Sequence, residues 1–201
     1  KITDLLIDLN LINNSSSQSL IKRKISKKLI SQYSGDTGHN INFRQFFLGY
    51  GLIHYGIVRN LQPHSLLCIG SRKGFIPAIL ALACKDNSIG HVDFVDAGYD
   101  MDEHSKHWSG IGFWKKEDPK KHFDKIGISD VITTYVMTTL EYVKKYPNKR
   151  YQYIYIDGDH SYIGVKINAS IIPKTIESKI GLIRRKDKTT KNIKIMAVIT
   201  F

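Results

Sequence analysis

The sequence has few of the residues that build disulfide or metal frameworks. Cys68 and Cys84 are its only cysteines. Cys68 falls in a stretch that predicts a strand and Cys84 in one that predicts a helix, so we interpret both as buried thiols. This argues against a disulfide-stabilised secreted domain and favours a reducing, cytoplasmic location.

Long apolar runs are also lacking. No stretch is long enough to cross a bilayer as a helix, and no signal peptide is recognisable. The chain starts at Lys1, however, so a segment upstream of it stays open. The 201 residues are 42% hydrophobic and 24% charged, which is typical of a globular protein with one sizeable core.

Positive charge is in clear excess, but no nucleic-acid motif accompanies it. The formal net charge is +12, and residues 167–201 carry half of it, with eight Lys or Arg and two acids. A second basic cluster lies between Lys22 and Lys28. Neither cluster contains interleaved exposed aromatic residues, so we favour solvated basic surface over a nucleic-acid site. Attraction to an acidic substrate or anionic glycan stays open.

The stretch from Ser65 to Asp100 organises the chain. Leu66 to Ile69 predict a short buried parallel strand, and Gly70 and Gly74 bracket a tight turn that lets backbone approach a ligand. Phe75 to Cys84 predicts a helix, Val92 to Val95 a second strand, and Asp96 stands at its end. In open parallel sheets ligands bind at this edge. A carboxylate there can accept hydrogen bonds from a ribose, so the stretch predicts a nucleoside-containing cofactor.

Strands and helices continue to alternate after this unit, which favours an α/β fold with a mostly parallel sheet and helices on both faces. We expect an N-terminal helical extension over 1–40 and a Rossmann-like domain over 41–201, with a truncated C-terminus as one expectation. The further elements that we predict are helices over 1–14, 20–33, 42–60 and 140–146, strands over 131–136, 151–156 and 193–201, and a charged loop over 184–191.

Residues 101–123 contain both tryptophans and three histidines without a clean period. We expect an ordered loop with a short helix, because long loops inside compact domains are often functional. His104, His107 and His122 lack the spacing of a metal site, so we favour a substrate lid or contacts to adenine. The stretch with Tyr33 and His39 is another candidate cover of the cofactor cleft.

Asp157, Asp159 and His160 follow the predicted strand that ends at Ile156. A carboxylate at a sheet edge can hold a divalent cation, and a histidine can take a proton from a hydroxyl near neutral pH. The alternative is a polar turn in which Asp159 caps the next helix. The position after a strand favours function, so Asp159 and His160 are our candidate catalytic residues and Asp157 a candidate metal ligand.

With these motifs the sequence resembles class I S-adenosylmethionine-dependent methyltransferases of family 24. The resemblance is carried by Leu67–Gly74 as the first motif, by Asp96, and by the block Asp157-Gly-Asp-His-Ser-Tyr162. It covers about Phe43 to Lys166. It implies a seven-stranded Rossmann-like fold and S-adenosylmethionine as the cofactor.

The resemblance also implies roles for single residues. Gly70, Ser71 and Gly74 would lie against the methionine part of the cofactor, Asp96 on the ribose, and Thr138 near the adenine. Related catechol-type enzymes imply Asp157 as a Mg²⁺ ligand and His160 as the general base.

Two departures from the family pattern weaken these implications. An acid usually stands two positions before the first glycine, where this chain has Cys68, so we expect weaker cofactor binding. Metal-dependent relatives take further ligands after the fifth strand, and these are missing if 193–201 is that strand.

We therefore predict an O-methyltransferase that acts on a small-molecule or sugar hydroxyl. A nicotinamide-dependent oxidoreductase is the first alternative, although the turn lacks the G-x-G-x-x-G spacing. The second is a degenerate binding module that holds an anionic polymer. The sequence gives no oligomeric state.

Overall fold

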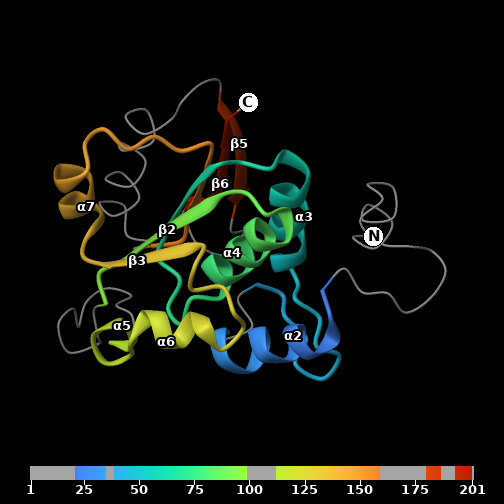
Figure 1. Ribbon diagram of the computed structural model, residues 1–201. Coiled ribbons are helices and arrows are strands. Elements are labelled where there is room, and N and C mark those ends of the chain that lie inside the picture. Colours follow the sequence, from blue (N-terminus) through green and yellow to red (C-terminus); the bar gives the residue numbers. More distant parts are fainter. Residues whose placement is uncertain (1–20, 35–38, 99–111, 159–179, 187–192, 201) are drawn as a thin grey trace.

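The computed structural model describes residues 21–34, 39–98, 112–158, 180–186 and 193–200, the last two ranges as backbone only. The helical elements in Figure 1 are α2 (Arg23–Lys28), the π-helical turn η1 (Leu29–Tyr33), α3 (Gly51–Leu61), α4 (Phe75–Asn87), α5 (Phe113–Lys116), α6 (Pro119–Asp124) and α7 (Thr139–Lys145). The strands are β1 (Ser65–Ile69), β2 (His91–Asp96), β3 (Ile132–Val136), β4 (Tyr153–Ile156), β5 (Ile180–Lys186) and β6 (Ile193–Thr200).

The strands form one sheet in the order β3-β2-β1-β4-β6-β5. Strands β1 to β4 are parallel to one another, as the sequence predicts. Ile69 is in register with Val95 on one side and with Ile156 on the other. The residues that follow β1, β2 and β4 therefore meet at one edge of the sheet, where parallel sheets bind their ligands.

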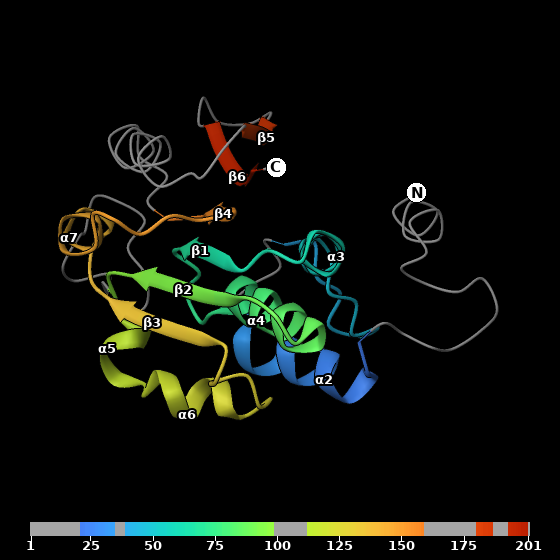
Figure 2. The same cartoon turned by 45° about the horizontal axis from the view of Figure 1, so that its top comes forward.

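Side chains of the parallel strands alternate between two apolar cores, because successive residues of a strand face opposite sides. On one side the strands pack against α4, which α3 and the N-terminal residues 21–34 cover in turn. On the other side Leu67, Ile69 and Val95 pack with Tyr142 of α7. Figure 2 shows α4, α2 and α6 below the sheet and α7 at the left.

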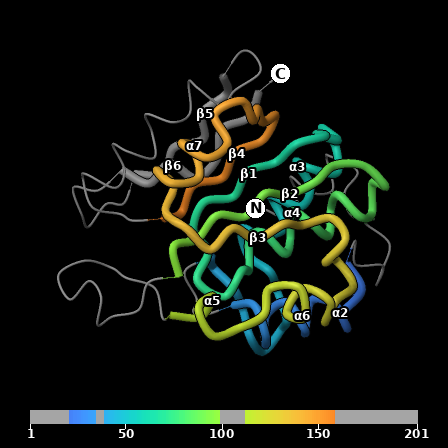
Figure 3. Tube along the Cα trace, turned by 60° about the vertical axis from the view of Figure 1, so that its left-hand side comes forward, coloured from blue at the N-terminus to red at the C-terminus, as the bar shows by residue number. Residues whose placement is uncertain are grey.

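The N-terminal segment joins the main core. Leu29, Ile30 and Tyr33 are fully buried with residues of α4, and Figure 3 shows α2 beside α6. The helix predicted over 20–33 is confirmed in its described part, whereas the helix predicted over 1–14 lies outside the described residues. The domain boundary at residue 40 stays a prediction.

The helix predicted over 42–60 begins only at Gly51. The side chain of Asn42 accepts hydrogen bonds from the amides of Arg44 and Gln45 (both 3.0 Å), which closes a turn. Gly49 has a φ of +54°, and a Cβ there would lie 2.0 Å from the carbonyl oxygen of His39. The chain therefore turns before α3 starts, and Phe43, which falls in the range predicted as helix, is exposed.

The C-terminal strands differ from the expectation in two ways. The strand predicted over 193–201 exists as β6, but it runs antiparallel to β4 and so is not a further parallel strand. Arg184 to Lys186, expected in a charged loop, belong to β5, which pairs antiparallel with β6. The rest of that loop, 187–191, lies outside the described residues.

The described part of the predicted loop 101–123 contains α5 and most of α6. The side chain of Asp118 accepts a hydrogen bond from the amide of Lys121 (3.1 Å), and Pro119 occupies the first helical position of α6. None of the described helices has the length and apolar character that a membrane span requires.

Candidate active site

The turn between β1 and α4 is held in a conformation with three left-handed residues. Gly70, Arg72 and Gly74 have φ values of +70°, +42° and +87°. The amide of Gly74 donates to the carbonyl of Ser71 (2.5 Å), and the hydroxyl of Ser71 accepts from the amide of Ile76 (3.3 Å). The predicted glycine turn is therefore present at the carboxyl end of β1.

Gly70 is required because the end of β4 lies directly against it. A Cβ at this position would come within 2.6 Å of the Cα of Gly158 and 2.7 Å of the carbonyl oxygen of Asp157. The amide of Asp157 donates to the carbonyl of Ile69 (2.8 Å). Gly70 of the first motif and Asp157, nearly ninety positions apart in the sequence, thus share one site.

Asp96 follows β2 at the same edge, as the sequence predicts. One of its oxygens accepts from the amide of Ser71 (3.2 Å) and the other from the amide of Gly98 (2.8 Å). Burial raises the pKa of Asp96, although these two amides oppose the rise. A carboxylate has about four acceptor positions, so each oxygen of Asp96 keeps capacity for a hydroxyl donor.

Asp157 contacts two residues, Tyr155 and His39, that the sequence analysis did not connect with it. Its Oδ2 accepts from the hydroxyl of Tyr155 (3.3 Å) and lies 3.7 Å from Nε2 of His39. The ring of His39 stacks on Phe75 at the start of α4 (5.4 Å between centroids). His39 therefore lies beside Asp157. Tyr33, the other residue of the predicted cover, is instead fully buried, with its hydroxyl bonded to the backbone carbonyl of His122, and the cover of the cleft stays a prediction for His39 alone.

His54 lies behind this edge and was missed by the sequence analysis. It is 3% exposed, and its Nδ1 is 2.6 Å from the hydroxyl of Tyr153. Burial lowers the pKa of His54 to about 4, so the ring is neutral. The available signal was its spacing with Gly51, Tyr55 and Val58, which form the buried face of α3.

Thr138 begins α7 beside the ends of β2 and β3. Its hydroxyl accepts from the amide of Glu141 (3.2 Å), and the carboxylate of Glu141 accepts from the amide of Thr138 (2.7 Å). This reciprocal pair is a capping box. It starts the helix that was predicted over 140–146, whereas the contact of Thr138 with adenine stays a prediction.

The remaining sequence-based assignments divide into buried and undescribed residues. Cys68 is fully buried in β1, and burial raises the pKa of its thiol, so it does not replace the missing acid. Asp159, His160, His104 and His107 lie outside the described residues. Among the residues that the structure does describe, no group of three or more His, Cys, Asp or Glu could hold a metal ion.

The match to a protein family decides the class of this site. A family model described as a methyltransferase domain, that of methyltransferase family 24, matches residues 67–178, which span the turn, Asp96 and the carboxylate block. The chain belongs to this methyltransferase family. The resemblance predicted from the motifs is therefore confirmed, and the methyltransferase is an enzyme of the transferase class.

Solved structures share the fold of this methyltransferase at low sequence identity. The O-methyltransferase TomG of Streptomyces achromogenes, involved in tomaymycin synthesis and solved with SAM, is 10% identical with a TM-score of 0.52, over 100% of this chain and 97% of that one. An O-methyltransferase of Bacillus cereus, solved with SAH, is 13% identical with a TM-score of 0.50, over 99% and 97%. No curated protein sequence matches the chain. These similarities confirm the Rossmann-like fold.

Proposed function

We propose that the methyltransferase uses S-adenosylmethionine to methylate a hydroxyl of a small molecule or sugar. The observation that carries the proposal is the half-buried carboxylate of Asp96 beside the Ser71–Gly74 turn, at the carboxyl edge of a parallel sheet. Family membership supports the transfer of a methyl group. Two proteins with the same fold are O-methyltransferases solved with SAM or SAH, which supports this cofactor and an oxygen acceptor.

The residues at this edge fit such a cofactor. Asp96 would accept hydrogen bonds from the ribose hydroxyls with the acceptor capacity that its two amide partners leave. Gly70, Ser71 and Gly74 would lie against the methionine part, and Thr138 near the adenine. The cofactor would supply an electrophilic methyl group on its sulfonium.

The protein's own part in the reaction is alignment and proton removal. Holding the acceptor oxygen in line with the methyl group replaces a bimolecular encounter with a positioned one. His160 is the base that we propose for the acceptor proton, and Asp159 its neighbour in the same turn. This turn follows Asp157, whose backbone lies against Gly70, so both would act at the edge where the cofactor turn begins.

We assign no step to a metal ion. Mg²⁺ requires several oxygen ligands in near-octahedral geometry. Asp157, the one ligand expected from the sequence, lies in no cluster of three potential ligands within the described ranges.

Isothermal titration calorimetry of the 201-residue chain tests the cofactor. We expect SAM and SAH to bind and NADH not to bind. Asp96→Asn should weaken SAM binding, whereas Asp130→Asn, which changes an exposed carboxylate before β3 at the opposite edge, should not. Absence of binding at millimolar SAM would overturn the proposal, and binding of NADH alone would favour an oxidoreductase.

The base is tested separately once an acceptor has been identified by screening small hydroxylated compounds and sugars. We expect His160→Ala to lower kcat on the order of 100-fold, the usual contribution of a general base, with unchanged SAM binding. An unchanged kcat would remove His160 from the mechanism without affecting the assignment of the cofactor.

A further inference from the structure

His122 is a buried histidine directly behind the cofactor turn, and the proposed reaction gives it no role. Its side chain is 1% exposed. The ring lies among the aromatic rings of Tyr33, Phe113 and Trp114, with centroids 4.5 to 5.4 Å away. A histidine in an aromatic core is expected to have a specific polar partner for each ring nitrogen.

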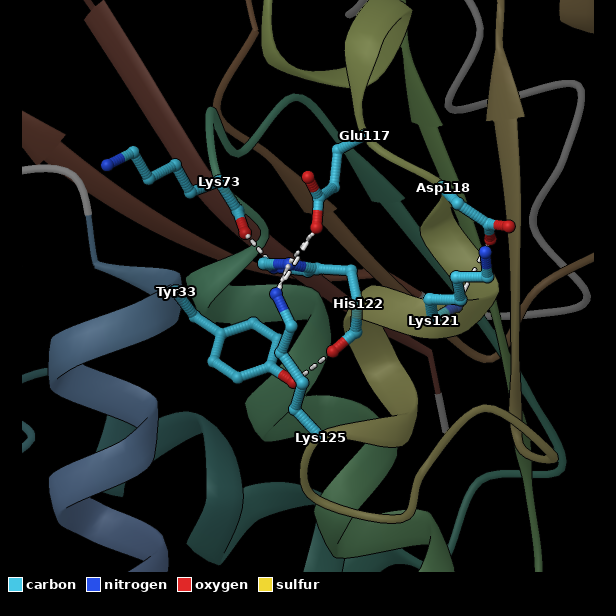
Figure 4. Close-up of polar contacts among 7 residues, drawn as sticks. All are labelled: Tyr33, Lys73, Glu117, Asp118, Lys121, His122 and Lys125. Carbon is cyan, nitrogen blue, oxygen red and sulfur yellow. Dashed lines mark hydrogen bonds and ion pairs between the residues drawn. The ribbon is translucent and has the colours of Figure 1, made fainter.

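Both ring nitrogens of His122 have such partners, as Figure 4 shows. Nε2 is 3.0 Å from the carbonyl oxygen of Lys73, and Nδ1 is 3.3 Å from Nζ of Lys125. A carbonyl only accepts and an ammonium only donates. Nε2 therefore carries the proton and donates to Lys73, while Nδ1 accepts from Lys125.

The charges around the ring agree with a neutral imidazole. Burial is the main cause that lowers the pKa of His122. The hydrogen bond to the Lys73 carbonyl raises this pKa, and the ammonium of Lys125 lowers it, so that the net shift is downward. Glu117 lies 3.7 Å from Nδ1, but it also pairs with Lys125 at 3.2 Å. The ring is thus fixed in one tautomer, with its donor directed at the turn.

The backbone that His122 contacts needs support. Arg72 is a non-glycine residue at a φ of +42°, between two glycines that are also left-handed. Such conformations cost energy and persist only where neighbours hold them. The carbonyl of Lys73 lies between Arg72 and Gly74, so a hydrogen bond to it restrains the half of the turn that Asp96 does not contact.

We propose that His122 is a positioning residue for cofactor binding, which holds the Lys73 carbonyl and thereby keeps the Gly70–Gly74 turn in its binding conformation. The inference rests on the proposed function. A turn that is already ordered loses less conformational entropy when it binds a ligand, so loss of the donor should weaken binding of the cofactor.

The N-terminal segment fixes His122 in turn. The hydroxyl of Tyr33 donates to the backbone carbonyl of His122 (2.6 Å), and Nζ of Lys28 donates to the carbonyl of Lys125 (2.7 Å). Residues 21–34 thus support the cofactor turn indirectly, through their contacts with His122 and Lys125. We place none of them at the cofactor itself.

Four forms of the 201-residue chain test this role: wild type, His122→Phe, His122→Gln and Val58→Ala. Phe keeps a ring but has no donor, whereas the amide nitrogen of Gln reaches the position of Nε2. Val58 is a fully buried residue of α3, and its truncation controls for lost stability away from the turn. The measurements are the Kd for SAH and the hydrogen exchange of the amides of residues 71–76 in the cofactor-free protein.

We expect His122→Phe to raise the Kd about tenfold, the effect of one hydrogen bond, and to speed exchange in the turn. His122→Gln should stay within about threefold of wild type, and Val58→Ala should bind like wild type. Should His122→Phe not fold, His122→Asn replaces it, since its shorter amide does not reach Lys73.

Two results would overturn the role of His122: a donor-less variant that binds and exchanges like wild type, or a Gln variant as impaired as the Phe variant. If wild type itself does not bind SAH, the proposed function fails and the role in cofactor binding fails with it, and exchange then decides only whether His122 holds the turn. Faster exchange in the turn of the Phe variant but not of the Gln variant would support it, and equal exchange would contradict it.

Discussion

Asp93 and Asp96 lie three residues apart on β2 and have different hydrogen-bond donors. Asp93 is 5% exposed and accepts hydrogen bonds from the hydroxyls of Tyr142 (2.8 Å) and Tyr151 (2.6 Å) and from the ammonium of Lys149. These three donors are side chains. Asp96 accepts from two backbone amides of the turns at the sheet edge.

The donors explain the difference in role. Side-chain donors from α7 and from the segment before β4 converge on Asp93, so this carboxylate ties three parts of the chain together. Backbone amides bind one position on each oxygen of Asp96 and leave the rest for a ligand, while burial raises the pKa of Asp96. The cost of burying a carboxylate is thus offset within the fold at Asp93 and, in our proposal, by the cofactor at Asp96.

The largest effect should come from Asp93→Ala. It leaves two buried hydroxyls and an ammonium without their acceptor, which costs about 4 kcal/mol of unfolding free energy. Urea unfolding measures the loss. The fraction that remains folded should bind SAM like wild type, and Asp130→Ala, at an exposed site, is the control. A loss below about 1 kcal/mol would end the contrast between the two carboxylates.

Asp96→Ala should show the opposite pattern. We expect the Kd for SAM to rise about 100-fold, the effect of two hydrogen bonds to a charged acceptor. Unfolding free energy should change by less than about 1 kcal/mol, since the fold holds Asp96 against the cost of its burial. Calorimetry measures SAM binding, and urea unfolding measures stability, in both Ala variants. If one variant lost both stability and binding, the contrast between a structural Asp93 and a ligand-binding Asp96 would be wrong.

The two carboxylates also show how far the sequence predicts the site. Asp96 was foreseen because it ends an apolar strand after a glycine turn, and short-range patterns define both features. Asp93 lies inside the strand, and nothing local indicates that Tyr142, Tyr151 and Lys149 meet it from positions 49 to 58 residues away. Long-range polar contacts depend on packing, which periodicity does not encode.

The same distinction applies to the elements. Strands β1 to β4 and helices α4 and α7 were predicted nearly at their observed bounds, because apolar runs, Gly74 and the Thr138 cap mark them locally. The start of α3 was misplaced, because the Asn42 turn and the crowded Gly49 prevent a helix over the first part of the range predicted. His54 was missed for a related reason: its spacing places it on the buried face of α3, but its contact with Tyr153 of β4 is visible only in the packed structure.

Acid should lower the stability of the protein through His54, which lies behind the edge of the sheet that carries Asp96. Its pKa is about 4 in the folded protein and about 6.5 in an unfolded chain, so the unfolded chain binds more protons between these values. Stability is therefore full above about pH 6.5 and falls as the pH is lowered towards 4, by about 2 kcal/mol between pH 7 and pH 5.

Urea unfolding of wild type and His54→Leu at both pH values measures this contribution. The Leu variant should lose most of the pH dependence. His91→Leu, which changes an exposed histidine bonded to Thr133, should keep it. If the unfolding free energy fell equally between pH 7 and pH 5 in wild type and His54→Leu, groups other than His54 would be the cause of the acid sensitivity.

Thr138 should give the smallest effect and the finest division between a structural and a ligand-binding role. Thr138→Ala removes the cap of α7 and should cost about 1 kcal/mol of unfolding free energy, whereas Thr138→Ser keeps the hydroxyl and should cost less than half of that. If Thr138 only caps, as Asp93 only stabilises, SAM binding is unchanged in both variants. If it also contacts adenine, the Kd rises in the Ala variant and not in the Ser variant. Capping and adenine binding would both use the hydroxyl of Thr138. The unfolding free energy and the Kd for SAM must therefore both be measured to decide whether Thr138 serves only the fold, like Asp93, or also the cofactor, as we propose for Asp96.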